Sequence, residues 1–173
     1  LAAMCSEGLA APPFYEGKLV RVIVGTSPGG GYDTYPRMIG RHLGKHIPGK
    51  PQIIVDNMPG GGGMIAANQL YKVAKPDGLT ISHFNGGLFF TQAVTPDQPG
   101  MEFDAQKFQY IGAPVKESAV AAFNQASGIT NIEKWRASPV AARMGGYGPG
   151  SFTPDIALNI LKAALGLPIH LVT

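Results

Sequence analysis

The stretch that decides the fold is KLVRVIVGTSPGGGYD, residues 18–33 of a 173-residue chain. Its first part, Lys18–Gly25, is rich in β-branched residues and ends in glycine, which predicts a buried strand. Its second part, Ser27–Asp33, is a glycine-rich turn, and apolar residues at helical spacing follow it to about His46. We expect Pro36 in the first turn of this helix, where a missing N–H group costs nothing. The residues predicted to share its apolar face are Tyr35, Met38, Ile39, Leu43 and Ile47.

The same arrangement repeats further along the chain. Gln52–Asp56 is predicted as a second strand, Pro59–Gly63 as a second glycine turn, and Met64–Ala74 as the next helix. A third strand is predicted at Leu79–Phe84, after the turn KPDG. Two strand–glycine–helix repeats that lead into another strand are typical of a βαβαβ unit with a parallel sheet. The fold class is therefore predicted to be α/β.

A second α/β unit is predicted from about residue 114 onward. It contains a third glycine turn, Gly145–Ser151, and a helix that follows it. Thr153 is the expected N-cap of that helix, Pro154 its first helical residue, and Gly166 lies just past its end. A short helix is expected at 129–136 and a loop at 93–104. The strands predicted around these elements are Phe108–Ala113, Ala119–Phe123, Ala141–Met144 and Ile169–Thr173.

The composition is that of a folded protein with few charges. Hydrophobic residues make up 45% of the chain and charged residues 14%, which excludes intrinsic disorder as the main state, because disorder needs low hydrophobicity. A net charge of +3 without a dense basic block excludes a nucleic-acid partner. The single cysteine, Cys5, excludes an intrachain disulfide and a cysteine-based metal site. The 24 glycines therefore need an explanation from their positions.

Basic and histidine side chains recur at a spacing of four on the first predicted helix. Arg37, Arg41 and Lys45 form one stripe, which we interpret as a solvated helix face. His42 and His46 have the spacing of a zinc-binding pair, but the HExxH context is absent. We interpret both histidines as surface residues and predict no metal site.

The glycine turns point to anion binding. Each follows a predicted strand and opens a helix, and ligands of open α/β sheets bind where such loops gather, at the carboxyl ends of the strands. Glycine lets backbone N–H groups approach a ligand, and the helix N-terminus adds about half a positive charge. We therefore predict that Ser27–Asp33 and Gly148–Asp155 each hold an anionic group. Within these turns, Asp33 and Asp155 are interpreted as first-turn residues that stabilise the helix dipole.

Two enzyme patterns in the sequence compete with this interpretation. Gly25–Gly29 fits the G-x-S-x-G nucleophile elbow, but the oxyanion hole needs the N–H of the residue after serine, and Pro28 has none. Gly61–Ala66 fits the dinucleotide fingerprint G-x-G-x-x-A, yet the next strand ends at Asn85 rather than at an acidic residue that would bind ribose. A nucleotide-dependent α/β enzyme that uses Gly61–Ala66 stays as the weaker alternative.

Four motifs together resemble a known family, the substrate-binding proteins of tripartite tricarboxylate transporters (Bug-type receptors). The resemblance runs from about residue 14 to residue 173, and four motifs in the right order are specific where each alone is modest. The motifs are VIVGTSPGGGYDTYPR (22–37), IVDNMPGGGGMIAA (54–67), KPDGLTI (75–81) and GGYGPGSFTPDIALNIL (145–161).

The resemblance implies a two-lobed, periplasmic-binding-protein-like (Venus flytrap) receptor without catalytic activity, cofactor or metal. Residues 14–113 would form lobe 1 (βαβαβ), and 114–173 the start of a lobe 2 that is cut short. Such a receptor binds a di- or tricarboxylate or related organic acid in the periplasm and delivers it, as a monomer, to the membrane permease subunits. A ligand sensor for a membrane kinase is an alternative with the same fold. Residues 1–13 are predicted to be the remnant of a cleaved secretory leader, or disordered.

The resemblance also implies the ligand-binding positions. In this family the first βα loop of each lobe grips one carboxylate through backbone N–H groups, small hydroxyls and ordered waters. The matching lobe 1 positions are Ser27, Gly30, Gly31, Tyr32 and Asp33, with Asn85, Gly86 and Gly87 in the loop after the third strand. The matching lobe 2 positions are Gly148, Gly150, Ser151 and Thr153, with Asp155 behind them.

Overall fold

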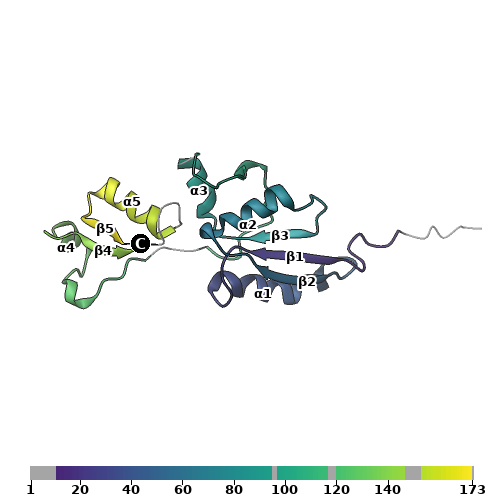
Figure 1. The fold of residues 1–173 in the computed structure, drawn as a ribbon. Helices are drawn as coiled ribbons and strands as arrows, with labels where there is room; N and C mark the ends of the chain where they lie inside the picture. The colour runs from purple at the N-terminus through teal and green to yellow at the C-terminus, as the bar shows by residue number, and fades with distance from the viewer. Residues whose placement is uncertain (1–10, 95–96, 117–119, 147–152, 173) are drawn as a thin grey trace, which may run out of the picture.

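The computed structural model describes residues 11–94, 97–116, 120–146 and 153–172. Two parallel sheets are present in these ranges, one in each half of the chain (Figure 1). The α/β class predicted from the sequence is confirmed. The division of the chain into two lobes at residue 114 stays a prediction, and residues 1–10, most of the predicted leader remnant, lie outside the described ranges.

The first sheet is the parallel βαβαβ unit that the sequence predicts. Its strands are β1 (Leu19–Val24), β2 (Gln52–Asn57) and β3 (Thr80–His83), in the order β2-β1-β3. Both pairings are parallel. β1 is the central strand, and its sequence is apolar except for Arg21, as is typical of a strand covered on both faces. Burial of each of its valines and its isoleucine contributes about 2 kcal/mol. These side chains are Val20, Val22, Ile23 and Val24.

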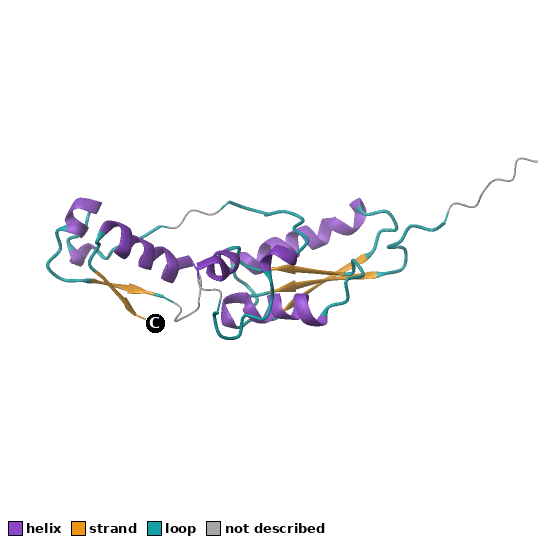
Figure 2. Ribbon diagram, turned by 90° about the horizontal axis from the view of Figure 1, so that it is seen from above, coloured by secondary structure: helices purple, strands orange, loops and turns teal. Residues whose placement is uncertain are grey.

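Two helical crossovers connect these strands. Helix α1 (Gly31–Leu43) leads from β1 to β2 and ends in a short 3₁₀ turn, Gly44–His46. Helix α2 (Met64–Asn68) follows the 3₁₀ turn Gly61–Gly63 and continues as a π turn, Gln69–Val73, before β3. Because β2 and β3 lie on opposite sides of β1, right-handed crossovers place α1 and α2 on opposite faces of the sheet (Figures 1 and 2).

Helix α1 corrects two expectations. It begins at Gly31, so Pro36 is its sixth residue rather than part of the first turn, and Pro36 is buried. The predicted apolar face is wrong for Met38 and Ile39, which are exposed, whereas Tyr35, Leu43 and Ile47 are half-buried. The helix instead approaches the sheet along Asp33, Pro36 and Gly40, where a Cβ on Gly40 would lie 3.3 Å from Cγ2 of Ile53. A glycine on the contact side lets the helix backbone come close to the strand.

The segment after β3 differs from the sequence prediction. Helix α3 (Gly87–Val94) was not predicted, and Phe108–Ala113, predicted as a strand, has no strand structure. Phe108 belongs instead to an aromatic cluster, with its ring centroid 5.6 Å from Phe103 and 5.8 Å from Phe89. The segment is therefore held by side-chain packing rather than by strand hydrogen bonds.

The second sheet pairs β4 (Ala142–Gly145) with β5 (Ile169–Val172) in parallel, and both strands lie where the sequence predicts them. Helix α5 (Thr153–Leu165) connects them, and the short helix α4 (Ile132–Arg136) precedes β4. The core of this unit is formed by Trp135, Leu158, Leu167 and Ile169.

The strand predicted at Ala119–Phe123 is absent from the described residues 120–123. Val120 is 93% exposed, whereas the Phe123 ring packs against Trp135 with centroids 4.7 Å apart. Like Phe108, Phe123 packs its side chain against a hydrophobic core although its backbone belongs to no strand.

Candidate functional site

Three loops meet at the carboxyl edge of the first sheet. They follow β1, β2 and β3, and the crossover from β2 passes close to the end of β1. The N–H of Met58 donates to the carbonyl of Val24 at 2.7 Å, and the N–H of Gly25 donates to the carbonyl of His83 at 2.9 Å. These bonds extend both strand pairings beyond the regular ladder, so the starts of the three loops are fixed relative to one another.

A close approach of two glycines brings the first two loops together. A Cβ on Gly25 would lie 2.9 Å from Cα of Gly63 and 3.0 Å from Cβ of Phe84, closer than real Cβ contacts. Gly63 has φ +98°, a left-handed conformation that favours glycine. The glycines at these two positions are therefore required by packing.

The loop after β1, which continues into the start of α1 at Asp33, is called the first glycine loop below. Asp33 is the centre of a hydrogen-bond network on the inner side of this loop. It is the third residue of α1 and only 3% exposed. Its Oδ2 accepts from the N–H of Gly29 at 2.8 Å and from Nε of Arg37 at 2.9 Å. Its Oδ1 accepts from Nδ2 of Asn57, at the end of β2, also at 2.8 Å. The carboxylate thus joins the loop, the helix and the neighbouring strand.

The network favours the ionised form of Asp33. Hydrogen bonds from Arg37, Gly29 and Asn57 hold the pKa of the Asp33 carboxyl well below its usual range, and they outweigh the opposing effect of burial. The hydrogen bond to Asp33 likewise raises the pKa of Arg37. The two side chains form an ion pair whose charges cancel behind the loop.

This depressed pKa predicts how stability depends on pH. A carboxylate with a lowered folded pKa contributes stability above the unfolded value of about 4, and this contribution is lost as the pH falls through the folded pKa. We expect the melting temperature of the wild type to fall more between about pH 5 and about pH 2 than that of Asp33→Asn. Calorimetric melting of both proteins across this range measures the difference. If the melting temperatures of the two proteins fell equally with pH, this stability could not be assigned to Asp33.

The start of α1 presents exposed backbone amides. Gly30 is the N-cap residue, and its carbonyl accepts from the N–H groups of Asp33 and Thr34. Gly30 and Gly31 are exposed, and a Cβ on either would meet nothing within 4 Å. The first N–H groups of a helix have no intrahelical acceptor, so this end of α1 can donate to an anion that approaches from solvent.

Asn85 connects the first glycine loop to the loop after β3. Its Nδ2 donates to the hydroxyl of Tyr32, and its Oδ1 accepts from the N–H of Gly87 at 2.8 Å. The ring of Tyr32 also lies against that of His83, with centroids 5.9 Å apart. The structure thus brings the predicted residues Tyr32, Asn85 and Gly87 together. Because Asn85 occupies the Gly87 amide, Gly86 is the more exposed backbone of this loop.

The remaining predicted positions are placed as follows. Ser27 is exposed in the loop after β1, and Asp33 is turned inward. In the second unit, Gly148, Gly150 and Ser151 lie outside the described residues, and Thr153 begins α5. Asp155 is 5% exposed, and a Cβ on Gly146 would overlap its carboxylate. The structure therefore describes the lobe 1 half of the predicted site in full and the lobe 2 half only in part.

Two residues of the network were missed or misread from the sequence. Arg37 was interpreted as part of a solvated stripe, but it donates to Asp33 and, through Nη2, to Oδ1 of Asn57 at 2.6 Å. The spacing of four between Asp33 and Arg37 is a signal that could have indicated the pair. Asn57 ends an apolar strand and carries no comparable local signal. His42 and His46 are exposed, as predicted.

The residues of the nucleotide fingerprint are used differently. Gly61–Gly63 form a 3₁₀ turn, and Gly63 is buried against Gly25 and Phe84, so its role is to pack α2 onto the sheet. Within the described ranges, no three His, Cys, Asp or Glu side chains gather as a metal site requires. No helix of the described chain is long and apolar enough to cross a membrane.

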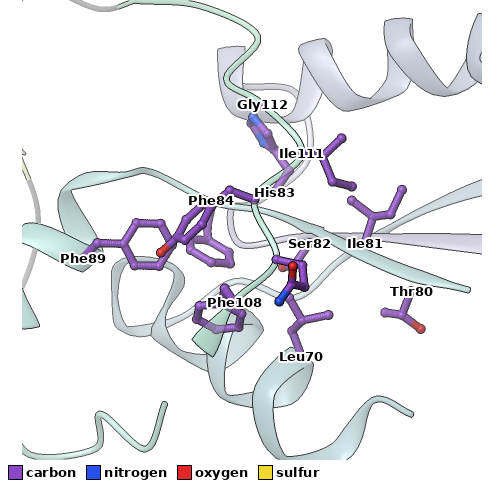
Figure 3. A pocket seen from close by; sticks show the side chains of 12 residues that line it. Leu70, Thr80, Ile81, Ser82, His83, Phe84, Phe89, Phe108, Ile111 and Gly112 are labelled. Atoms are coloured by element: carbon purple, nitrogen blue, oxygen red, sulfur yellow. The ribbon is translucent and has the colours of Figure 1, made fainter. Parts of the chain in front are cut away.

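A cavity of about 180 Å³ lies along β3, an edge strand of the first sheet (Figure 3). Its walls are formed by both ends of β3, by Leu70, and by the aromatic side chains Phe84, Phe89 and Phe108. None of the predicted ligand positions lines it. Its lining is mixed, because Ser82, His83 and Gln109 lie beside the aromatic side chains.

Comparison with known proteins gives one informative similarity. No family model matches the chain. A UPF0065 protein of Bordetella bronchiseptica is 34% identical over 117 residues, which cover 66% of this chain and 33% of the relative. The chain spans about a third of the length of this curated relative. The sequence is therefore similar to a UPF0065 protein over about two thirds of its own length.

Proposed function

We propose that this protein is a periplasmic solute receptor that binds a small di- or tricarboxylate, or a related organic acid, for a tripartite tricarboxylate-type secondary transporter. The observation that carries the proposal is the open N-terminus of α1 at the carboxyl edge of a parallel sheet. There the exposed backbone of Gly30 and Gly31 lies beside the Tyr32–Asn85 pair. The similarity to a UPF0065 protein supports it, together with the four motifs that resemble Bug-type receptors.

Recognition in lobe 1 relies on dipoles rather than on a free charge. One ligand carboxylate accepts hydrogen bonds from the amides of Gly30 and Gly31 at the positive end of α1. The hydroxyl of Ser27 and the exposed backbone at Gly86 supply further donors at its rim. Arg37 neutralises Asp33 behind the loop, so the ligand meets no uncompensated negative charge.

The second unit completes the receptor in this proposal. Its loop between β4 and α5 carries Gly148, Gly150, Ser151 and Thr153, which would grip the other end of the ligand when two lobes close like a flytrap. The loaded receptor then delivers the acid to the membrane permease subunits. No step of this cycle requires a catalytic residue or a cofactor.

Isothermal titration calorimetry tests the proposal with a panel of citrate, succinate and malate, and with NADH and ATP as the nucleotide arm. We expect saturable binding of at least one acid and no binding of either nucleotide. Succinamide, which matches succinate in shape but carries no charge, is the control and should give no saturable heat. Binding of a nucleotide with silence across the acids would instead favour the alternative built on Gly61–Ala66.

A further inference from the structure

The partners of Asp33 are not those of a simple helix-capping carboxylate. A first-turn acid that only complements the helix dipole stays near solvent and accepts from amides of its own turn. Asp33 is 3% exposed, and its three donors come from Gly29 before the helix, Arg37 one turn later, and Asn57 on β2. The carboxylate of Asp33 is therefore held by three separate parts of the chain, and it also holds these three parts together.

Asn57 extends the same network to the backbone of the loop. Its Nδ2 donates both to Oδ1 of Asp33 at 2.8 Å and to the carbonyl of Thr26 at 2.9 Å. The loop between Thr26 and Asp33 is thus held at one end by Asn57 and near its middle by the bond from Gly29 to Asp33. The exposed Gly30, the N-cap residue, and Gly31, the first residue of α1, follow directly after Gly29.

We propose that Asp33 is a positioning residue for ligand binding and does not contact the ligand. By accepting the N–H of Gly29, its carboxylate fixes the turn that directs the amides of Gly30 and Gly31 toward solvent. Arg37 and Asn57 keep that carboxylate ionised and in place. The inference rests on the proposed function, because the directed amides matter only if they bind an anion.

The second unit also places a buried aspartate in the first turn of its helix. Asp155 is the third residue of α5, as Asp33 is of α1, and both helices are thirteen residues long. Asp155 is 5% exposed and lies so close to Gly146, at the end of β4, that a side chain there would overlap its carboxylate. In both units a buried first-turn aspartate therefore packs against the glycine segment that precedes its helix.

The test combines an amide signal with an affinity. In protein labelled with ¹⁵N-glycine, we expect Asp33→Asn to shift the Gly29 amide resonance and to weaken citrate binding at least tenfold. Asp56→Asn is the matched control, since Asp56 forms a half-exposed ion pair with Arg21 on the same sheet but does not contact the loop. It should change neither the Gly29 resonance nor the citrate Kd.

Arg37→Gln provides a second variant if Asp33→Asn does not fold. The Arg37 side chain is 41% exposed, so its replacement leaves the core intact while it removes the charge and a donor to Asp33. We expect a shifted Gly29 resonance and a severalfold weaker citrate Kd. If the wild type binds no organic acid, the proposed function fails. If the wild type binds citrate and the variants bind it equally well with an unmoved Gly29 signal, this inference alone is overturned.

Discussion

Replacement of Gly30 by valine is expected to abolish organic-acid binding while the protein stays folded. Gly30 has φ −84° and ψ 172°, an extended conformation that valine adopts readily, and a Cβ there would meet nothing within 4 Å. The branched side chain would, however, occupy the space in front of the Gly30 and Gly31 amides. We expect binding at least about 100-fold weaker, which corresponds to roughly 2.7 kcal/mol.

Calorimetric titration of the variant beside the wild type measures this effect. Gly112→Val is the matched control, because Gly112 also has open space around its Cα but lies far along the chain from the glycine loop, beside the β3 cavity. It should bind like the wild type. An unchanged Kd for Gly30→Val would show that the ligand does not approach these amides.

Replacement of Gly25 by valine is expected to have the largest effect on stability. Its Cβ would lie 2.9 Å from the backbone Cα of Gly63, which cannot move aside without displacing the start of α2. Forcing side-chain atoms into a packed core costs about 3 kcal/mol in severe cases. For a unit of this size that cost lowers the melting temperature by roughly 10 °C or more.

Thermal unfolding followed by circular dichroism measures this loss. Gly112→Val serves as control here too, and its melting temperature should match that of the wild type. A variant Gly25→Val that melts with the wild type would mean that the loops after β1 and β2 are not pressed together as the structure has them. The contact between Gly25 and Gly63 would then not hold these two loops together at the carboxyl edge of the sheet.

The parallel sheet could be predicted because its signals are local. An apolar strand such as Leu19–Val24 that ends in a glycine turn needs no tertiary information to be recognised. Phe108–Ala113 has similar residues but failed as a prediction, because a strand also needs a neighbour with which to pair. The same limit explains the misread face of α1, where contact with β2 runs through Gly40 rather than through Met38.

The location of the site could be predicted from its glycine-rich loops and from the order of the strands that precede them. The meeting of Tyr32 with Asn85 follows from the rule that loops after parallel strands share one edge. The roles of Arg37 and Asn57 depend on how a helix residue and a strand end lie in space, 20 residues apart in sequence. No pattern in a single sequence indicates that the side chains of Arg37 and Asn57 lie within hydrogen-bond distance of each other.

In the proposed receptor, exposed glycine amides at the start of α1 bind an organic anion, and a titration followed by NMR can detect that contact. Amide spectra of ¹⁵N-glycine-labelled protein are recorded as citrate is added. We predict saturable shifts of the Gly30 and Gly31 resonances, while Gly17 and Gly128, in turns outside the three loops, stay still. Saturable citrate binding that leaves Gly30 and Gly31 unmoved would contradict the account.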